Sequence, residues 1–408
     1  MKEDWQKVKL GEIATFSNGI NFGKESYSSG VKLISVSDFG DRYFPDYNSL
    51  VEIDEKVLKE SDYLKNGDIV FVRSNGNKEL VGRCMMIKNP QYPVTYSGFC
   101  IRARLNNLEK FDTKFFLYNF KSRKFRQSIA NLSKGTNIQN LNQQILSNYE
   151  IDLPPLSIQK KISSILSSYD DLIENNNKQI KLLEETAQKL YKEWFVKLNF
   201  PGHENTKILD GVPEGWTVEK IGTKFLTVLG GTPLRQKKEF WENGTIPWIN
   251  SGKVNEYRIL TPSEYITESA LEHSATKLLP KHTTVVAITG ATLGQISYTE
   301  IETCANQSVI GIIDKDDFLS TYIYCFMINN IQIIIKKATG SAQPHINKDI
   351  LDSTDIVIPS KDIISRFSEI SKSIFNDIYI LSKQNQDLQV SRDKLLPKLM
   401  NQEIEVTA

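Results

Sequence analysis

Two acidic stretches contain the residue types of a metal-dependent nuclease, but their pattern is weak evidence for one. Pro45-Asp46 followed by Asp54-Glu55-Lys56 can be fitted to a PD…(D/E)xK pattern. That pattern is very permissive, and the interval is short for a metal site built from two strands. A solvated loop is the better interpretation, and a nuclease that uses Asp46 and Glu55 is kept as a competing hypothesis.

A second stretch, Asn89-Pro90-Gln91-Tyr92, differs by one residue from the Asn-Pro-Pro-Tyr/Phe signature of adenine-N6 methyltransferases. The second proline of the signature is absent, and no glycine-rich strand and loop lie upstream to hold a cofactor. A turn between two strands explains the same residues. We therefore predict that this chain carries no catalytic residues.

The histidines and cysteines do not indicate a metal site. The histidines are scattered, at His203, His273, His282 and His345, and the four cysteines form no CxxC pair. Isolated thiols of this kind fit a reducing compartment rather than a zinc site or a disulfide framework. No Walker A loop is present, so no nucleotide-driven motor is implied.

A basic run lies on a predicted amphipathic helix from Thr113 to Ala130, and no acidic residue interrupts it. Its members and a lysine that follows are Lys121, Arg123, Lys124, Arg126 and Lys134. Such a run is often a solvated helix face, but it can also neutralise DNA phosphates and position a protein without reading bases. Lys336 and Lys337 form a weaker version in the second half of the chain.

Base reading needs loop side chains with fixed donors and acceptors, because arginine or lysine suits guanine and asparagine or glutamine suits adenine in the major groove. The candidates in the first half are Asn18, Asn21, Arg73, Asn75, Asn77, Lys78 and Arg83. Those in the second half are Thr232, Arg235, Gln236, Lys237, Asn250, Lys253, Thr292 and Gln295. The alternative is that many of them are ordinary polar loop residues. Core packing is the prediction for three aromatic residues, Tyr43, Tyr47 and Trp248.

These loops need a scaffold, and a long helix is the strongest structural signal in the chain. After Pro154-Pro155 about forty residues follow without proline or glycine, which would make a rod roughly 60 Å long. Apolar residues alternate at steps of four and three, at Ile158, Ile162, Ile165, Tyr169, Leu172, Ile180, Leu183, Ala187, Leu190 and Trp194. This is the heptad seam of a helix packed on a partner helix.

The partner helix lies in the same chain and belongs to an internal repeat. Its seam comprises Ile363, Phe367, Ile370, Ile374, Ile378, Leu381, Leu388, Leu395 and Leu399, and a shift of 205 positions superimposes much of the first seam on it. Two further echoes pair Trp5–Gly11 with Trp216–Gly222 and Gly135–Asn142 with Gly340–Asn347. The chain is therefore predicted to consist of two similar halves, an internal repeat.

The repeat predicts an α+β fold in which two mixed α/β domains are separated by two long helices. The predicted segments are a first domain at 1–153, a helix at 154–200, a linker at 201–215, a second domain at 216–358, a helix at 359–402 and a tail at 403–408. The linker would reach at most about 45 Å, less than the length of the helix. We therefore expect an antiparallel coiled coil and a pseudo-twofold relation between the repeats. The polar interruption Asn175-Asn176-Asn177 either fixes the register or marks where the helices diverge.

Composition excludes several classes of protein. Lys+Arg 50 against Asp+Glu 49 gives a net charge of +1, so nucleic-acid contacts must come from local patches. Hydrophobic residues at 40% and charged residues at 24% are ordinary for a globular protein. The N-terminus has no apolar signal core. The most apolar stretch, Tyr322 to Ile335, is interrupted by three amides and is too short for a bilayer. A cytoplasmic location without membrane contact is expected.

Several motifs in order carry a family resemblance. Leu153-Pro154-Pro155-Leu156 opens the first helix, and Leu190-Tyr191-Lys192-Glu193-Trp194-Phe195-Val196 closes it. Pro213-Glu214-Gly215-Trp216 opens the second domain, and Gly340–Asn347 precedes the second helix. In this order and spacing the chain resembles, over essentially its whole length, the specificity (S) subunit of type I restriction-modification systems. It departs from the family at the second helix start, Pro359-Ser360-Lys361-Asp362, which lacks the double proline.

The resemblance implies that each domain is a target-recognition domain that reads one half of a bipartite, asymmetric site on double-stranded DNA. It further implies that the helices set the spacer and dock two methyltransferase (modification) subunits, and that restriction or translocase subunits can join the complex. S-adenosylmethionine would be bound by the methyltransferase partner, with no cofactor in this chain. The alternative from another class is a coiled-coil adaptor whose domains bind protein or RNA without preference for any duplex sequence.

Overall fold

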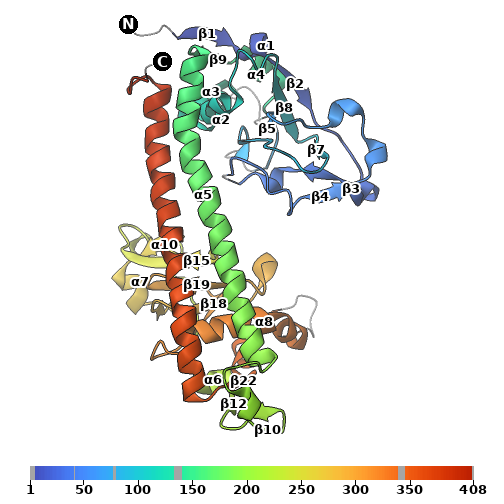
Figure 1. Ribbon diagram of the computed structural model, residues 1–408. Coiled ribbons are helices and arrows are strands. Elements are labelled where there is room, and N and C mark those ends of the chain that lie inside the picture. The colour runs from blue at the N-terminus through green and yellow to red at the C-terminus, as the bar shows by residue number, and fades with distance from the viewer. Residues whose placement is uncertain (1–4, 41, 77–79, 133–139, 339–344, 407–408) are drawn as a thin grey trace. The chain divides into compact units, whose positions relative to one another are not determined.

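The computed structural model describes residues 5–40, 42–76, 80–132, 140–338 and 345–406 of the chain. Contacts divide the chain into a first unit, Met1–Leu172 with Leu388–Ala408, and a second unit, Ile173–Asp387. Two long helices, α5 (Leu156–Tyr191) and α10 (Lys361–Met400), each contribute residues to both units (Figure 1). The contact units thus divide the helices, whereas the predicted segments set the helices apart from the domains.

The first unit contains two small sheets and a strand pair. The larger sheet has the order β2 (Ala14–Asn18), β8 (Cys100–Leu105), β5 (Ile69–Val72) and β6 (Cys84–Met86). The smaller sheet has the order β4 (Val51–Ile53), β3 (Tyr27–Ile34) and β7 (Val94–Tyr96). Strands β1 (Gln6–Lys9) and β9 (Glu150–Leu153) pair antiparallel. The helices are α1 (Leu10–Ile13), α2 (Thr113–Lys121), α3 (Arg123–Leu132) and α4 (Gln143–Asn148).

The second unit repeats this plan, with one more strand in each of its two sheets. One sheet has the order β13 (Leu226–Leu229), β21 (Val309–Ile313), β18 (Thr284–Ala287), β19 (Ile296–Thr299) and β15 (Arg258–Ile259). The other has the order β16 (Glu264–Ile266), β14 (Ile246–Ile249), β20 (Thr303–Ala305) and β17 (Leu278–Leu279). The strand pairs are β12 (Thr217–Lys220) with β22 (Asp355–Ile358), and β10 (Ile208–Leu209) with β11 (Val212–Pro213). The helices are α6 (Ile221–Lys224), α7 (Glu268–Glu272), α8 (Ser320–Ala338) and α9 (Lys348–Asp352).

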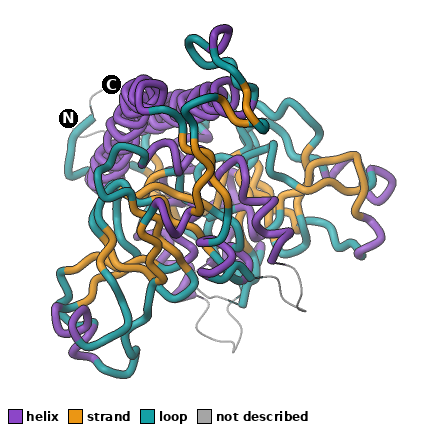
Figure 2. The backbone as a smooth tube through the Cα atoms, turned by 90° about the horizontal axis from the view of Figure 1, so that it is seen from below, coloured by secondary structure: helices purple, strands orange, loops and turns teal. Residues whose placement is uncertain are grey.

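Each unit is built around one strand that is buried on both faces. All four residues of β5 are buried, and alternation sends Phe71 into the core under the helices and Val70 into the core of the smaller sheet. In the second unit β18 does the same, with Val286 in one core and Val285 in the other. In Figure 2 the strands, drawn in orange, are joined by extensive loops, drawn in teal. The mixed α/β character predicted for both domains is confirmed.

The two long helices run antiparallel in both units, as predicted. In the first unit Arg392, near the end of α10, contacts Asp170 in the first half of α5. In the second unit a single π-helical turn (Lys192–Val196) follows α5 and carries Trp194. The ring centroid of Trp194 lies 6.1 Å from that of Phe367, near the start of α10. Residues that come later in α5 therefore meet residues that come earlier in α10.

Part of the predicted seam is wrong. Ile165, Leu172 and Ile370 are exposed, at 38%, 52% and 43%. Buried positions on α5 instead include Leu166 and a polar residue, Asp170. The reason is that α5 buries two adjoining faces, one against α10 and one against the domain. A strict heptad describes only the first of these faces.

The polar interruption in α5 holds the register of the helix pair. The buried Asn176 amide donates to Asn385 Oδ1 at 2.9 Å and to Gln384 Oε1 at 3.0 Å. Asn385 in turn donates to Asn177 Oδ1 at 2.9 Å. A slip of the helices would leave buried amides without partners, and that desolvation is costly. Of the two interpretations offered for the interruption, the structure supports register fixing.

The predicted single helix over 113–130 is two helices. The chain turns at Ser122, whose backbone is extended and whose Oγ accepts a hydrogen bond from Phe125 N at 3.2 Å. A serine that caps a new helix competes with continuation of the old one. The break places the cations of the basic run on two helices instead of one face.

A buried guanidinium joins the second domain to both long helices. Arg258 on β15 is only 3% exposed. Its Nη1 lies 2.6 Å from Glu184 Oε1 on α5, and its Nε lies 3.6 Å from Glu300 Oε1. Its guanidinium carbon lies 4.2 Å from the ring centroid of Phe375 on α10. Burial raises the pKa of Glu184, and the neighbouring guanidinium opposes that shift.

A second polar contact ties the same domain to α10. His282 Nδ1 lies 3.0 Å from Asp317 Oδ2, and Lys372 Nζ on α10 lies 3.2 Å from the same oxygen. The hydrogen bond to Asp317 raises the pKa of His282, while burial acts in the opposite direction. Burial also raises the pKa of Asp317, but hydrogen bonds from His282 and Ser320 outweigh it and leave that pKa at about 2.

Replacing Arg258→Met is predicted to destabilise the protein by about 3–5 kcal/mol, because two buried carboxylates lose their counter-charge. The measurement is the free energy of unfolding in urea. The control is Lys220→Met, which removes an exposed ion pair with Asp355 and should cost at most about 1 kcal/mol. Equal losses in the two variants would contradict the role given to Arg258.

The His282–Asp317 contact predicts a pH-dependent contribution to stability. Because the pKa of His282 is higher in the folded state, the contribution is full below the unfolded value of about 6.5 and is lost as pH rises through the folded value. His282→Asn keeps a residue that tolerates the positive φ at this position. Unfolding free energies measured at about pH 6 and about pH 9 should therefore differ between wild type and variant more at the lower pH. His273→Asn is the control, since the His273 ring contacts only a backbone carbonyl, and a similar pH-dependent difference in it would refute the assignment.

Candidate nucleic-acid interface

Three loops of the first unit are joined by backbone hydrogen bonds into one surface, here called the first tip (residues 18–21, 73–76 and 97–99). Gly19 N donates to Cys100 O at 3.1 Å, and Gly98 N donates to Ile20 O at 2.6 Å. Arg73 N donates to Phe99 O at 2.8 Å. A Cβ on Gly19 would lie 2.2 Å from the carbonyl oxygen of residue 97, so this close approach requires glycine.

Four of the predicted base-reading residues gather in the first tip. Asn18 ends β2 and is exposed, and Asn75 is half-buried in the loop after β5. The Asn21 side chain lies against Gly98, where a Cβ would be 2.1 Å from Asn21 Oδ1. Arg73 Nη1 donates to Gly98 O at 3.3 Å. Amide and guanidinium groups are thus displayed on a framework fixed by main-chain bonds.

The second unit forms the same framework from residues 230–232, 288–291 and 306–308, here called the second tip. Gly230 N donates to Val309 O at 2.9 Å, matching the bond from Gly19 to Cys100. Ile288 N donates to Ser308 O at 2.9 Å, matching the bond from Arg73 to Phe99. These shared bonds define structurally equivalent positions without any reference to side chains.

At the equivalent positions the side chains differ in size, charge or hydrogen-bonding character. The pairs are Asn21 and Thr232, Arg73 and Ile288, Arg83 and Gln295, Gly98 and Gln307, and Phe99 and Ser308. In the second tip the Thr232 hydroxyl donates to the Gln307 side chain. The two tips therefore present different chemistry on one backbone arrangement.

The basic run of the first unit is partly neutralised by contacts that the sequence does not reveal. Lys124 Nζ pairs with Asp152 Oδ2 at 2.8 Å. Lys121 donates to a backbone carbonyl and lies 4.7 Å from the ring centroid of Tyr43. Arg123 is exposed at the start of α3, and Arg126 is half-buried. Three candidates, Asn77, Lys78 and Lys134, lie outside the described residues.

Several other candidates are also held by neighbouring groups. Arg83 Nη1 donates to Gly40 O at 2.9 Å. Arg235 forms a two-pronged contact with Glu264 at 2.6 and 2.8 Å and lies 3.7 Å above the ring of Trp241. Lys237 lies 3.5 Å from Glu239, and Lys253 Nζ lies 2.7 Å from Glu256. The hydrogen bonds from Arg235 lower the pKa of Glu264. These cations already bind protein groups, so a contact with DNA would compete with those contacts or add to them.

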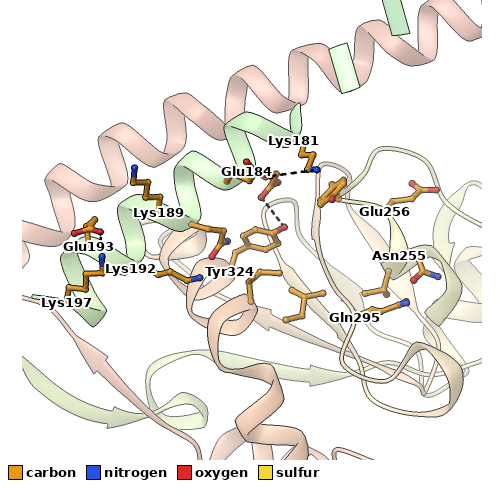
Figure 3. Close-up of a pocket in the computed structure, with 16 residues that line it drawn as sticks. Lys181, Glu184, Lys189, Lys192, Glu193, Lys197, Asn255, Glu256, Gln295 and Tyr324 are labelled. Carbon is orange, nitrogen blue, oxygen red and sulfur yellow. Dashed lines mark hydrogen bonds and ion pairs between the residues drawn. The ribbon is translucent and has the colours of Figure 1, made fainter. Parts of the chain in front are cut away.

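Gln295 lines a pocket of about 710 Å³ in the second unit. Figure 3 shows Gln295 and Asn255 on the side opposite the residues of α5, with Tyr324 between them. The Tyr324 hydroxyl contacts Glu184 at 3.5 Å. Gln295 Oε1 is buried and has no hydrogen-bond partner within the part of the chain that the structure describes. Lys336 and Lys337 are exposed in the last turn of α8.

The residues weighed for catalysis have structural roles where the chain is described. Asp54 Oδ1 accepts a hydrogen bond from Lys56 N at 2.9 Å and caps a short 3-10 turn, Glu55–Val57. Asn89 has a φ of 44°, in keeping with the predicted turn. Among the described residues no group of three or more His, Cys, Asp or Glu side chains is placed to hold a metal. Within the same ranges, no helix is both long and apolar enough to cross a membrane.

Sequence reasoning missed the turn at 97–99. β8 begins at Cys100, so Phe99 lies in the turn before that strand, and its side chain is 62% exposed. Gln307 and Ser308 of the second tip were missed as well. A turn with one exposed residue leaves no periodic signal, and only the matched backbone bonds identify it. Among the predicted core aromatics, Trp248 is buried, with only 2% of its surface exposed.

Comparison with known proteins agrees with this geometry. The profile of the type I restriction modification DNA specificity domain matches residues 2–185 and again residues 213–390. The type I restriction enzyme MjaIX specificity subunit of Methanocaldococcus jannaschii is 27% identical over 99% of this chain and 94% of its own length. The HindI specificity subunit of Haemophilus influenzae is 23% identical over 98% of this chain and its full length.

A solved structure has a similar fold. The S subunit of a type I restriction-modification system from M. genitalium superimposes with a TM-score of 0.55 at 18% identity, covering 99% of this chain and 97% of the other. Two family matches in one chain agree with the two tips described above. The chain belongs to the family of type I restriction-modification DNA specificity subunits.

Proposed function

We propose that this protein is the DNA sequence-specificity subunit of a type I restriction-modification complex. Each tip reads one half of a bipartite site on double-stranded DNA, and the site is asymmetric. The observation that carries this function is the pair of tips with matching backbone bonds and unlike side chains, such as Arg73 against Ile288. A recognition protein needs a constant framework for geometry and variable side chains for sequence. The adaptor alternative gives no reason for this combination.

The catalytic parts of the reaction belong to partner subunits in this proposal. The long helices dock two methyltransferase subunits, and restriction or translocase subunits join them. S-adenosylmethionine binds to the methyltransferase, which must take its target base out of the helix stack to reach it. The complex works in the cytoplasm, where the DNA is. The contribution of this chain is to bind and position the duplex.

The functional prediction is tested by mixing this chain with its partner methyltransferase subunit and mapping methylated bases across a genome. The expected result is one site made of two unlike half-sites separated by bases that are not read. A single continuous palindrome would contradict the arrangement of two different tips. The adaptor alternative predicts that adding this chain leaves methylation without any sequence preference.

A phosphate contact by the basic run is predicted at Arg123. Arg123→Gln should reduce the slope of log K against log salt concentration by about 0.9, the value expected for the loss of one phosphate contact. Lys124→Gln should change the slope less, because Asp152 already neutralises Lys124. Fluorescence anisotropy of the assembled complex on labelled duplex gives the slopes. Lys178→Gln, which removes an exposed cation of α5 paired with Glu174, is the control. An unchanged slope for Arg123→Gln would remove this residue from the interface.

A further inference from the structure

Phe99 is the most prominent aromatic side chain on the surface of the first unit. It is 62% exposed, more than any other large aromatic residue recorded as exposed in the described parts of the chain. Its neighbours in the turn, Gly98 and Cys100, are both buried. A single large apolar ring therefore stands out from an otherwise well-packed turn.

The backbone holds this ring outside the protein. Arg73 N and Ser74 N both donate to Phe99 O, at 2.8 and 3.4 Å. On either side, Gly98 N donates to Ile20 O at 2.6 Å and Cys100 N donates to the carbonyl of residue 97 at 2.8 Å. These bonds fix the main chain that carries the ring, and the ring itself is exposed.

The surroundings of Phe99 in the tip are polar. Asn21 and Arg73 lie against the neighbouring Gly98, and Asn18 ends the adjacent strand. Amide and guanidinium groups suit base edges and phosphates, whereas an apolar ring among them suits the faces of bases. Apolar side chains of this kind can enter between base pairs, partly unstack them and kink the duplex.

The second tip has no ring in the corresponding place. Ser308 occupies the position that matches Phe99, since its carbonyl accepts the equivalent hydrogen bond from Ile288. An exposed apolar residue of the second unit, Leu234 at 65%, lies in a different loop. The effect of the ring should therefore be confined to one half-site.

We propose that Phe99 inserts into the base stack of the half-site read by the first unit and unstacks one base step. The proposal rests on the proposed function and adds a deformation of the DNA to it. Specificity at that step then depends on how easily the two base pairs separate, as well as on hydrogen bonds to their edges.

The experiment uses the full complex of this chain with its methyltransferase subunit and a duplex carrying the mapped site. 2-Aminopurine, an adenine analogue whose fluorescence rises on unstacking, replaces in turn each adenine of both half-sites. The methylated base and its neighbours are left out, because the methyltransferase itself unstacks them. Phe99→Ala is compared with wild type, and Phe99→Trp tests whether another ring restores the effect.

Two matched controls separate this residue from exposed apolar side chains in general. Tyr92→Ala removes a 54% exposed aromatic ring from the other end of β7, and Leu234→Ala removes an exposed apolar side chain from the second unit. Both are expected to behave as wild type. Thermal unfolding of Phe99→Ala should match wild type, because the ring contributes little to the core.

Wild type should raise fluorescence in one half-site only, and Phe99→Ala should lose that rise. Its affinity for the site should fall roughly 10- to 100-fold, the range expected for loss of one base–aromatic stack, and Phe99→Trp should retain both properties. Specific binding by Phe99→Ala with fluorescence and affinity unchanged would overturn the insertion and leave the proposed function standing. A wild-type complex without any sequence preference would overturn both.

Discussion

Pairing between a guanidinium and a carboxylate of α5 is the interaction on which both units depend. In the second unit Arg258 of β15 meets Glu184, and in the first unit Arg392 of α10 meets Asp170. Tyr118 of α2 also donates to Asp170, so the helix carboxylate connects both α10 and the first domain. A charge in such a dry site is costly unless its partner stays in place. The sheets, and the loops at their ends, therefore have little freedom to move along the helix to which they are joined.

With that constraint in place, the tips can differ without changing the fold. Main-chain donors and acceptors define both tips, and the matched bonds from Gly19 and Gly230 are the same in length to within a few tenths of an ångström. Hydrogen bonds between main-chain groups do not depend on which side chain each residue carries, apart from the glycines at close approaches. In the proposed function, affinity comes from the common scaffold and sequence preference comes from variable positions such as Arg73 and Gln307.

The larger features of the fold could be predicted from the sequence because they repeat. Helix periodicity and the shift between the two seams predicted the long helices and the duplicated domains, and the short reach of the linker predicted the antiparallel pairing of the helices. Individual seam residues such as Ile165 were wrong, because a helix packed on two neighbours does not obey one heptad. The site was harder. Arg235 and Lys124 are paired with acids that are distant in sequence, and Phe99 is exposed in a turn that leaves no periodic signal. Such contacts depend on three-dimensional proximity, which a single sequence does not record.

The glycines of the tips have a consequence for how the protein can acquire a new target. Any Cβ at Gly19 or Gly230 would lie 2.2 Å from a carbonyl oxygen, so these positions tolerate no exchange. The exposed side chains around them can vary without altering the main-chain bonds that define the tips. In the proposed function, changes at these positions alter the DNA sequence that is read, and an engineered library that spares the two glycines should remain largely foldable.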